Sequence, residues 1–337
     1  MQLNQKGVCI LDLDFYKNNN INVDLAIEAH DIVRGELGTE IPGAVVDRHK
    51  FPNAAVTTVK VVEERAAQMM GKPVGTYITI EAPAIRDNNR IAQKEVAEIL
   101  AQQLSSLFSL PDNANILIVG LGNWQATPDS LGPKVVEQTI VTRHLYRYAP
   151  EELKGGMRSV SAMAPGVLGI TGIESAEIIK GVVENIQPEL IIAIDALAAG
   201  SVDRIGTTIQ IADTGVSPGS GIGNKRTGIN RETMGVLTIA IGVPTVVNAA
   251  IIAQITIEHF LEKLKTNPML NKVQQSVMPD YTQGVINDIL SPFGGNLMVT
   301  PKEVDSLILD TSKIVAGGIS MALHPAISAE EYSMYLN

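Results

Sequence analysis

NILIVGLGNWQATPDSLGPKVVEQTI, residues 115–140, is the stretch that decides the fold. It opens with the continuous apolar run ILIVG and passes through a glycine turn and a loop into a helical pattern. A run without polar alternation is typical of a strand covered on both faces. LIIAIDAL (190–197) is a second such run, and helical spacing follows over 130–143 and 173–186. These alternating strands and helices predict an α/β fold, a three-layer, mostly parallel sheet flanked by helices.

Other segments extend this alternation. Further strands are predicted over 159–164, 207–213 and 237–246, and further helices over 91–108 and 246–264. Nearer the start, AVTTVKVV (55–62) and VGTYITI (74–80) are rich in β-branched residues and are separated by turn residues. Such a pair is typical of neighbouring antiparallel strands. We therefore expect an added antiparallel β element before the parallel part of the sheet.

The first 24 residues differ from the rest. The run NNNIN (18–22) is polar and has neither helical nor strand period, which favours a linker or an exposed arm. From Leu25 the sequence LAIEAHDIV has apolar residues at helical spacing, with Asp24 placed as an N-cap. We predict an N-terminal arm, residues 1–24, followed by one domain, residues 25–337.

Composition excludes several classes of protein. The 26 basic residues against 36 acidic ones give a net charge of −10 without a basic stripe, which argues against a nucleic-acid partner. Cys9 is the only cysteine, so no internal disulfide can form, and a reducing compartment fits. The N-terminus does not read as a signal peptide, and no apolar run of about 18 residues predicts a membrane span. We expect a cytoplasmic protein without a membrane partner.

Two glycine-rich segments resemble phosphate-binding loops. A dinucleotide fingerprint needs G-x-G-x-x-G, but Gly120 and Gly122 are followed by Gln125, and the turn leads into a loop rather than a helix. The segment SPGSGIGNKRTG (217–228) lacks the order of a P-loop. It is either a flexible surface loop or a substrate-binding loop that carries Lys225 and Arg226.

Two aspartates lie at or just after the carboxyl ends of predicted parallel strands, where ligands bind in α/β sheets. Asp129 lies in the loop after one buried strand, and Asp195 ends the apolar part of another. Because parallel strands end at the same edge of a sheet, the two carboxyls can converge on one crevice. Together they could share a proton and activate water, or hold a divalent metal. The structural alternatives are a helix N-cap for Asp129 and a turn-stabilising carboxylate for Asp195.

The five histidines give no metal site by spacing, since none is two to four residues from another. His144 follows Arg143 at the predicted end of the helix after Asp129. A helix C-cap or a core hydrogen bond is its favoured role. Catalysis or substrate binding is the alternative.

Seven segments carry a family resemblance. They are VDLAIEAHDI (23–32), VGLGNWQATPDSLGPKVV (119–136), TRHL (142–145), APGVLGITGIES (164–175), IIAIDALAA (191–199), PGSGIGNKR (218–226) and GGNLMVTPKEVD (294–305). Through them nearly the whole chain resembles the germination proteases of endospore-forming bacteria, peptidases that degrade small acid-soluble spore proteins. That family is similar in fold to the hydrogenase maturation peptidases, which share a G-x-G-N…D-x-x-G loop.

The resemblance implies an atypical aspartic-type endopeptidase whose two acids correspond to Asp129 and Asp195. The maturation peptidases bind nickel through acidic residues at the corresponding positions and through a histidine. That histidine has no clear match here, so a site without metal or cofactor is favoured, although a metal between the two acids stays open. The resemblance further implies a homotetramer in the spore core.

The resemblance also implies a zymogen that removes its own N-terminal segment. Family substrates are cut after Glu and before a large apolar residue, which is followed by Ala and, three residues after the apolar one, by Glu. Asp24, Leu25, Ala26 and Glu28 match that register if Asp24 replaces Glu. Cleavage between Asp24 and Leu25 is therefore expected, with residues 1–24 as the propeptide.

Two rival functions remain at this point. One is a non-catalytic α/β scaffold that binds spore proteins through the same crevice. The other is a nickel-dependent maturation peptidase. Digestion of a spore protein would separate the first rival from a protease, and metal analysis with a chelator would separate the second.

Overall fold

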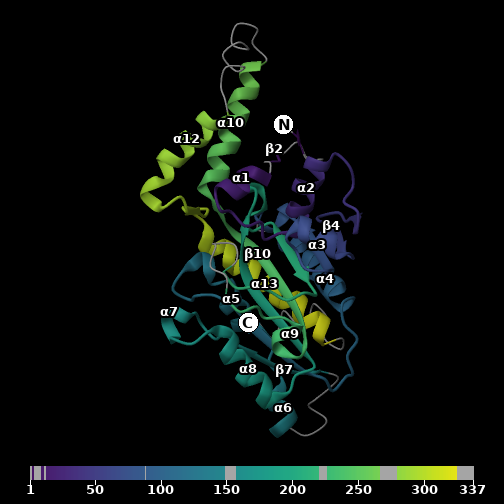
Figure 1. Cartoon of the computed structure of the whole chain (residues 1–337). Helices are drawn as coiled ribbons and strands as arrows, with labels where there is room; N and C mark the ends of the chain where they lie inside the picture. The colour runs from purple at the N-terminus through teal and green to yellow at the C-terminus, as the bar shows by residue number, and fades with distance from the viewer. Residues whose placement is uncertain are drawn as a thin grey trace.

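The computed structural model describes residues 2–3, 9–10, 13–87, 89–148, 157–219, 226–265 and 279–324 (Figure 1). Within these residues nine strands form one mixed sheet with helices on both faces. The predicted α/β class and its three layers are confirmed, whereas the sheet is mixed rather than mostly parallel. The sheet follows the order β3-β4-β5-β9-β10-β8-β6-β7, and β11 pairs with β10 outside that path.

One half of the sheet is parallel. It consists of β7 (Ser159–Met163), β6 (Asn115–Gly120), β8 (Leu190–Ala199) and β10 (Leu237–Asn248), each parallel to its neighbour. Successive side chains of β6 face opposite layers: Ile116 packs among the helices of one face, and Leu117 among those of the other. Both layers take apolar side chains, which explains why this strand shows no polar alternation.

The other half is antiparallel and larger than the sequence indicated. The predicted pair is confirmed as β4 (Ala55–Val61) and β5 (Gly75–Glu81). Two further strands flank it: β9 (Thr208–Ala212), which joins β5 to β10, and β3 (Ala44–Lys50) at the edge. Strand β3 was not predicted because most of its side chains are exposed, as is common for an edge strand that carries charges.

The helices cover the sheet in two layers. On one face α4 (Arg90–Ser105), α5 (Leu131–Glu137) and α13 (Val304–Leu323) pack on the sheet through a shared apolar core. On the other face α8 (Ser175–Ile186) and α9 (Arg231–Met234) cover the parallel half, while α2 (Ala26–Leu37) and α3 (Glu64–Met70) cover the antiparallel half. Helix α13 is long and apolar enough to span a membrane, but 67% of its most apolar window is buried in the protein, as expected of a core helix.

The helix predicted over 130–143 is shorter than expected. It ends at Glu137, and α6 (Arg143–Tyr148) is a separate helix. Between them Thr142 accepts a hydrogen bond from the Val160 amide at 2.9 Å and so ties the chain to β7. The β-branched residues of TIVT (139–142) favour this extended connection over a continued helix.

The N-terminal arm is exposed only in part: Asn18, Asn20 and Asn22 are exposed, as predicted, but the helix that ends at Asn18 is anchored. Helix α1 (Leu13–Asn18) buries Phe15 and Tyr16 in an apolar cluster that also contains Ile251 and Ile286. These belong to α10 (Ala249–Lys265) and α12 (Pro279–Leu290), which project from one end of the molecule (Figure 1). The prediction of an exposed segment therefore holds for the asparagine run and is wrong for α1, which two adjacent aromatic side chains anchor.

Short elements complete the described chain. They are β1 (Gln2–Leu3), β2 (Cys9–Ile10), β11 (Met298–Val299), α7 (Leu168–Thr171) and the 3-10 turns Pro83–Ile85, Thr127–Asp129, Val202–Arg204 and Ser291–Phe293.

Candidate active site

The loop after β6 is shaped by close backbone contacts at glycines. Gly122 has φ +115°, and a Cβ there would lie 2.0 Å from the carbonyl oxygen of Asp129. Gly120 approaches α5 so closely that a Cβ would lie 2.2 Å from the carbonyl oxygen of Gly132. These glycines therefore close the loop on itself and on the helix. Their spacing follows from that closure and needs no bound dinucleotide to explain it.

This closed loop fixes Asp129. The Asn123 amide donates to the Asp129 carboxylate at 2.9 Å and to its carbonyl oxygen at 3.0 Å. The residue at the N-cap of α5 is Ser130, so the predicted alternative of Asp129 as that helix cap is wrong. Asp129 is half-buried at the end of a 3-10 turn, with its carboxyl aimed into a pocket.

Asp195 reaches the same pocket from the neighbouring strand. Strand β6 ends at Gly120, which pairs with Ile194 of β8, and the Leu121 amide still donates to the Ile194 carbonyl at 2.8 Å. Beyond that point β8 continues without β6 beside it, so Asp195 faces the loop that carries Asp129. The Asp195 carboxylate accepts the Ala196 amide at 3.0 Å, which agrees with the predicted structural role, and the residue lines the pocket.

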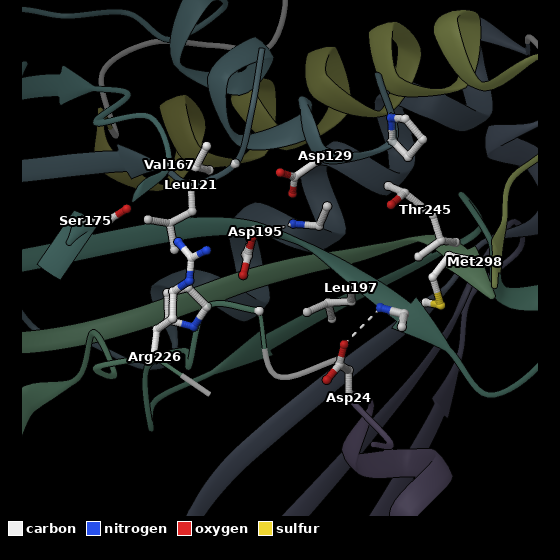
Figure 2. A pocket seen from close by; sticks show the side chains of 17 residues that line it. Asp24, Leu121, Asp129, Val167, Ser175, Asp195, Leu197, Arg226, Thr245 and Met298 are labelled. Carbon is white, nitrogen blue, oxygen red and sulfur yellow. Dashed lines mark hydrogen bonds between the residues drawn. The ribbon is translucent and has the colours of Figure 1, made fainter. Parts of the chain in front are cut away.

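The two aspartates share one pocket at the edge where the parallel strands end. Figure 2 shows their carboxyls on adjacent walls, with Arg226 beside them and Asp24 below. Apolar side chains form much of the remaining lining; they include Leu121, Val167, Leu197, Val246 and Met298. The arrangement has the polar centre and apolar walls of a small-molecule or peptide site.

The environment separates the two acids. Burial raises the pKa of Asp195 well above its usual value, and the negative charges of Asp129 and Asp24 raise it further. Burial also raises the pKa of Asp129, but the Asn123 amide and the positive charge of Arg226 oppose that rise. Asp195 therefore holds a proton more readily than Asp129. A protonated acid next to an ionised one is the state needed for general acid–base chemistry.

Asp24 is a third acid in this pocket, as the expected cleavage beside it requires. It is not the predicted helix N-cap, because Leu25 occupies that position before α2. Its carboxylate accepts the Ala198 amide at 2.9 Å, and Asp24 is only 8% exposed (Figure 2). The following residue, Leu25, is fully buried. The predicted cleavage position thus lies inside the molecule, against β8, three residues along that strand from Asp195.

Side chains from the antiparallel half hold the chain around Asp24. Lys72 Nζ donates to the Asp24 carbonyl oxygen at 2.7 Å, and Gln210 on β9 accepts the Ala26 amide at 2.6 Å. Glu28 accepts the Gly200 amide at 2.9 Å and pairs with Arg204 at 3.2 Å. None of these partners was singled out from the sequence, because no local spacing connects them with residues 24–28.

The predicted basic residues meet different outcomes. Arg226 lines the pocket and acts electrostatically on Asp129. Lys225 lies outside the described residues. His144 is exposed in the first turn of α6, so its predicted role as a helix C-cap or core residue is wrong, and it is not among the residues that line this pocket. Of the three candidates, only Arg226 is brought to the aspartates.

Metal ligands do not cluster in the described part of the chain. No group of three or more His, Cys, Asp or Glu side chains there is placed to hold a metal ion. The described pocket has carboxylates on its walls and no histidine. The donor set therefore lacks the histidine of the maturation-peptidase nickel site.

Comparison with known proteins gives consistent matches over most of the chain. The family model described as germination protease matches residues 24–281 and 274–336. A germination protease of Caldanaerobacter subterraneus subsp. tengcongensis is 46% identical over 321 residues, covering 94% of this chain and 98% of the relative. That of Bacillus subtilis is 41% identical over 355 residues, covering 94% and 96%.

A solved structure gives a weaker likeness. A nickel-iron hydrogenase maturation protease from Thermococcus kodakarensis is 22% identical, with a TM-score of 0.29. The likeness covers 42% of this chain and 80% of that one.

Proposed function

The chain belongs to the germination protease family, and from this premise we propose that it is an endopeptidase that hydrolyses small acid-soluble spore proteins. Membership of the family makes the chain a peptidase active in spore germination. The substrate class, the catalytic residues and the processing of the chain are the proposed part. The observation that carries the catalytic proposal is the convergence of Asp129 and Asp195 on one pocket.

Asp129 is the general base and Asp195 the general acid in this proposal. The Asp129 carboxylate takes a proton from water as the water oxygen attacks the substrate carbonyl carbon. Asp195 gives its proton to the amide nitrogen that leaves. This division is supported by the pKa of Asp195, which burial, Asp129 and Asp24 hold well above its usual value, whereas Arg226 and the Asn123 amide favour the ionised form of Asp129.

Self-processing between Asp24 and Leu25 is the second part of the proposal. Asp24 lines the pocket that contains both catalytic aspartates, so the junction and the acids belong to one site. While Asp24 stays in place, it occupies part of the pocket that a substrate chain would need. Removal of residues 1–24 opens the pocket and converts the precursor into the active form, leaving residues 25–337 as the peptidase domain.

Arg226 is proposed to engage the acidic residue that precedes the cleaved bond in a spore protein. It lies beside the aspartates and carries the charge needed to attract a carboxylate. The active form is proposed to be a homotetramer in the spore core. Sedimentation of the processed protein would measure the subunit number.

Incubation of the purified full-length chain with a small acid-soluble spore protein tests the proposal. Mass spectrometry over time should show loss of residues 1–24 first and then spore-protein fragments that end in an acidic residue. A chain that begins at Leu25 should digest the substrate without delay. Leu25→Lys should remain unprocessed. An intact spore protein after incubation with the Leu25 form would contradict the proposed substrate class.

A further inference from the structure

Two side-chain donors meet at one backbone carbonyl next to the pocket. Lys72 Nζ lies 2.7 Å and Gln210 Nε2 lies 3.4 Å from the carbonyl oxygen of Asp24. Gln210 also accepts the Ala26 amide through its Oε1 atom at 2.6 Å. Gln210 therefore binds the backbone on both sides of Leu25, and Lys72 polarises the Asp24 carbonyl group.

The backbone of Lys72 is positioned by the end of α3. Gly71 adopts the left-handed conformation with φ +63°, and the amides of Gly71 and Lys72 both donate to the Ala67 carbonyl oxygen. Ala67 and Met70 are buried in the cluster under the antiparallel half. A packed helix end thus aims Lys72 at the Asp24 carbonyl, in keeping with the usual geometry of a helix C-terminus.

The two donors to the Asp24 carbonyl oxygen lie outside the pocket that contains the catalytic aspartates. Among the described residues Asp24, Asp129 and Asp195 line the pocket, whereas Lys72 and Gln210 do not. One side of Asp24 therefore faces the acids, and its carbonyl oxygen faces the donors. This is the placement that an oxyanion site requires, since water attacks from the pocket while the oxygen is held from behind.

We propose that Lys72 is a catalytic residue of self-processing, which stabilises the negative charge on the Asp24 carbonyl oxygen when water adds to the carbonyl carbon. This inference rests on the proposed cleavage between Asp24 and Leu25. Gln210 is the second donor and keeps the peptide bond in place.

The step balances without another reactant. The water oxygen bonds to the Asp24 carbonyl carbon, one water proton passes to Asp129, and the carbonyl π electrons move onto the oxygen that Lys72 holds. The tetrahedral centre then collapses, the bond to the Leu25 nitrogen breaks, and that nitrogen takes the proton of Asp195. Lys72 keeps its protons throughout and acts only through charge and hydrogen bonding.

Two carboxylates next to Lys72 favour its ammonium form against the larger, opposing effect of burial. Burial lowers the pKa of Lys72, and the carboxylates of Asp24 and Glu28 oppose that decrease. A charged donor forms stronger hydrogen bonds than a neutral one, most of all to an oxygen that gains charge. Lys72 thus contributes more to the transition state than to the precursor.

The test follows self-processing of the full-length chain by mass spectrometry. Lys72→Met should lower the first-order rate constant for loss of residues 1–24 by about 10²–10³-fold, the usual loss for one oxyanion donor. Lys72→Arg, which keeps a charged donor, should retain within about tenfold of the normal rate. Lys60→Met, on exposed Lys60 of β4, is the matched control and should process normally.

Hydrogen exchange separates catalysis from simple anchoring. The Ala26 amide should stay protected in Lys72→Met, because Gln210 still accepts it. A slow variant with a protected Ala26 amide supports the inference. A slow variant whose Ala26 amide exchanges freely would overturn it, since Lys72 would then only hold the chain. Processing at the normal rate would overturn it too.

A folding control and a second variant complete the design. Thermal unfolding verifies that each variant folds, and Lys72→Gln replaces Lys72→Met if the latter does not; it should slow processing at least tenfold. If the unsubstituted chain never loses residues 1–24, the proposed self-processing fails and this inference fails with it. Failure confined to the unchanged rate of Lys72→Met leaves the proposed function standing.

Discussion

The parallel and antiparallel halves of the sheet contribute to the site in different ways. In the parallel half, the pairing of β6 with β8 ends at Ile194 while β8 continues to Ala199, and this offset exposes Asp195 to the loop of Asp129. In the antiparallel half, β9 and the turn before β5 supply Gln210 and Lys72, which bind the backbone around Asp24. One half presents acids, and the other presents donors that hold a peptide.

This difference follows from strand direction. Parallel strands end together, so side chains from separate loops gather at one edge even when the strands are far apart in sequence. Antiparallel strands end alternately at both edges, and their contribution comes from side chains along the strand, such as Gln210 in the middle of β9. One sheet can therefore carry the acids on its parallel half and the side chains that bind the backbone around Asp24 on its antiparallel half, without separate domains.

The largest effect is expected from substitution of the two aspartates in the parallel half of the sheet. Asp195→Asn and Asp129→Asn should each lower substrate cleavage and self-processing by about 10²–10⁴-fold, because an amide can neither accept a proton from water nor supply an acid. Rates of peptide release, measured on folded variants, give the result. Asp203→Asn, on exposed Asp203 in the turn after β8, is the matched control. Near-normal turnover by either site variant would remove that residue from the mechanism.

A somewhat smaller effect is expected at the turn that positions Asp129. Gly122→Ala places a Cβ 2.0 Å from the Asp129 carbonyl oxygen, so the loop must move. Displacement of a catalytic carboxyl by about 1 Å can cost about 10²-fold in rate. Gly38→Ala, at φ +68° with no atom within 4 Å of the added Cβ, should cost stability without slowing cleavage. Equal activity in the two variants would contradict the role of the turn.

On the antiparallel half, Glu28 of α2 should make the stability of the protein depend on pH. Burial raises the pKa of Glu28 from 4.5 to about 7 in the folded state, despite the opposing charge of Arg204. The unfolded chain ionises first as pH rises, so this group makes the protein less stable between about pH 4.5 and 7, by about 3 kcal/mol in all. Glu28→Gln should therefore raise the melting temperature at pH 8 and weaken its fall over that range.

Melting curves at several pH values measure this effect. Glu98→Gln, on the exposed face of α4, is the control and should leave the curves unchanged. A lower melting temperature for Glu28→Gln at pH 8 would show that the Arg204 ion pair outweighs the cost of burying the charge.

The smallest effect is expected on the surface of the parallel half. Lys134 on α5 pairs with Glu137 at 2.7 Å and lies 5.8 Å from the centre of the Trp124 ring. Both partners of the ion pair are exposed, so Lys134→Ala should change the free energy of unfolding by less than about 1 kcal/mol. Cleavage should continue at its normal rate. A large loss of activity would place Trp124 or α5 in substrate binding.

Sequence reasoning was most successful where the structure repeats a local pattern. The runs ILIVG and LIIAIDAL became β6 and β8 because both layers around them are apolar. Asp129 and Asp195 could be paired in advance because the ends of parallel strands converge by geometry. The Asp24–Leu25 junction came from a family pattern, and its cleavage remains a prediction.

The remaining features depend on contacts between distant residues. Lys72, Gln210 and Arg204 reach residues 24–28 across long separations in the chain, and no periodicity encodes such contacts. The arm was misjudged for a related reason. Its asparagines indicated exposure, while Phe15 and Tyr16 found an apolar surface on α10 and α12 that the arm itself does not reveal. Strand β3 was missed because its exposed charges hide the β pattern.

The position of Asp24 within the pocket of its own chain has a consequence for timing. A bond that is already held beside its catalytic groups reacts in a unimolecular step, so the encounter of two molecules does not enter the rate. The half-time of such a reaction is the same in a dilute and in a concentrated solution. The proposed self-processing would then proceed at the same rate however many copies of the precursor a cell has made.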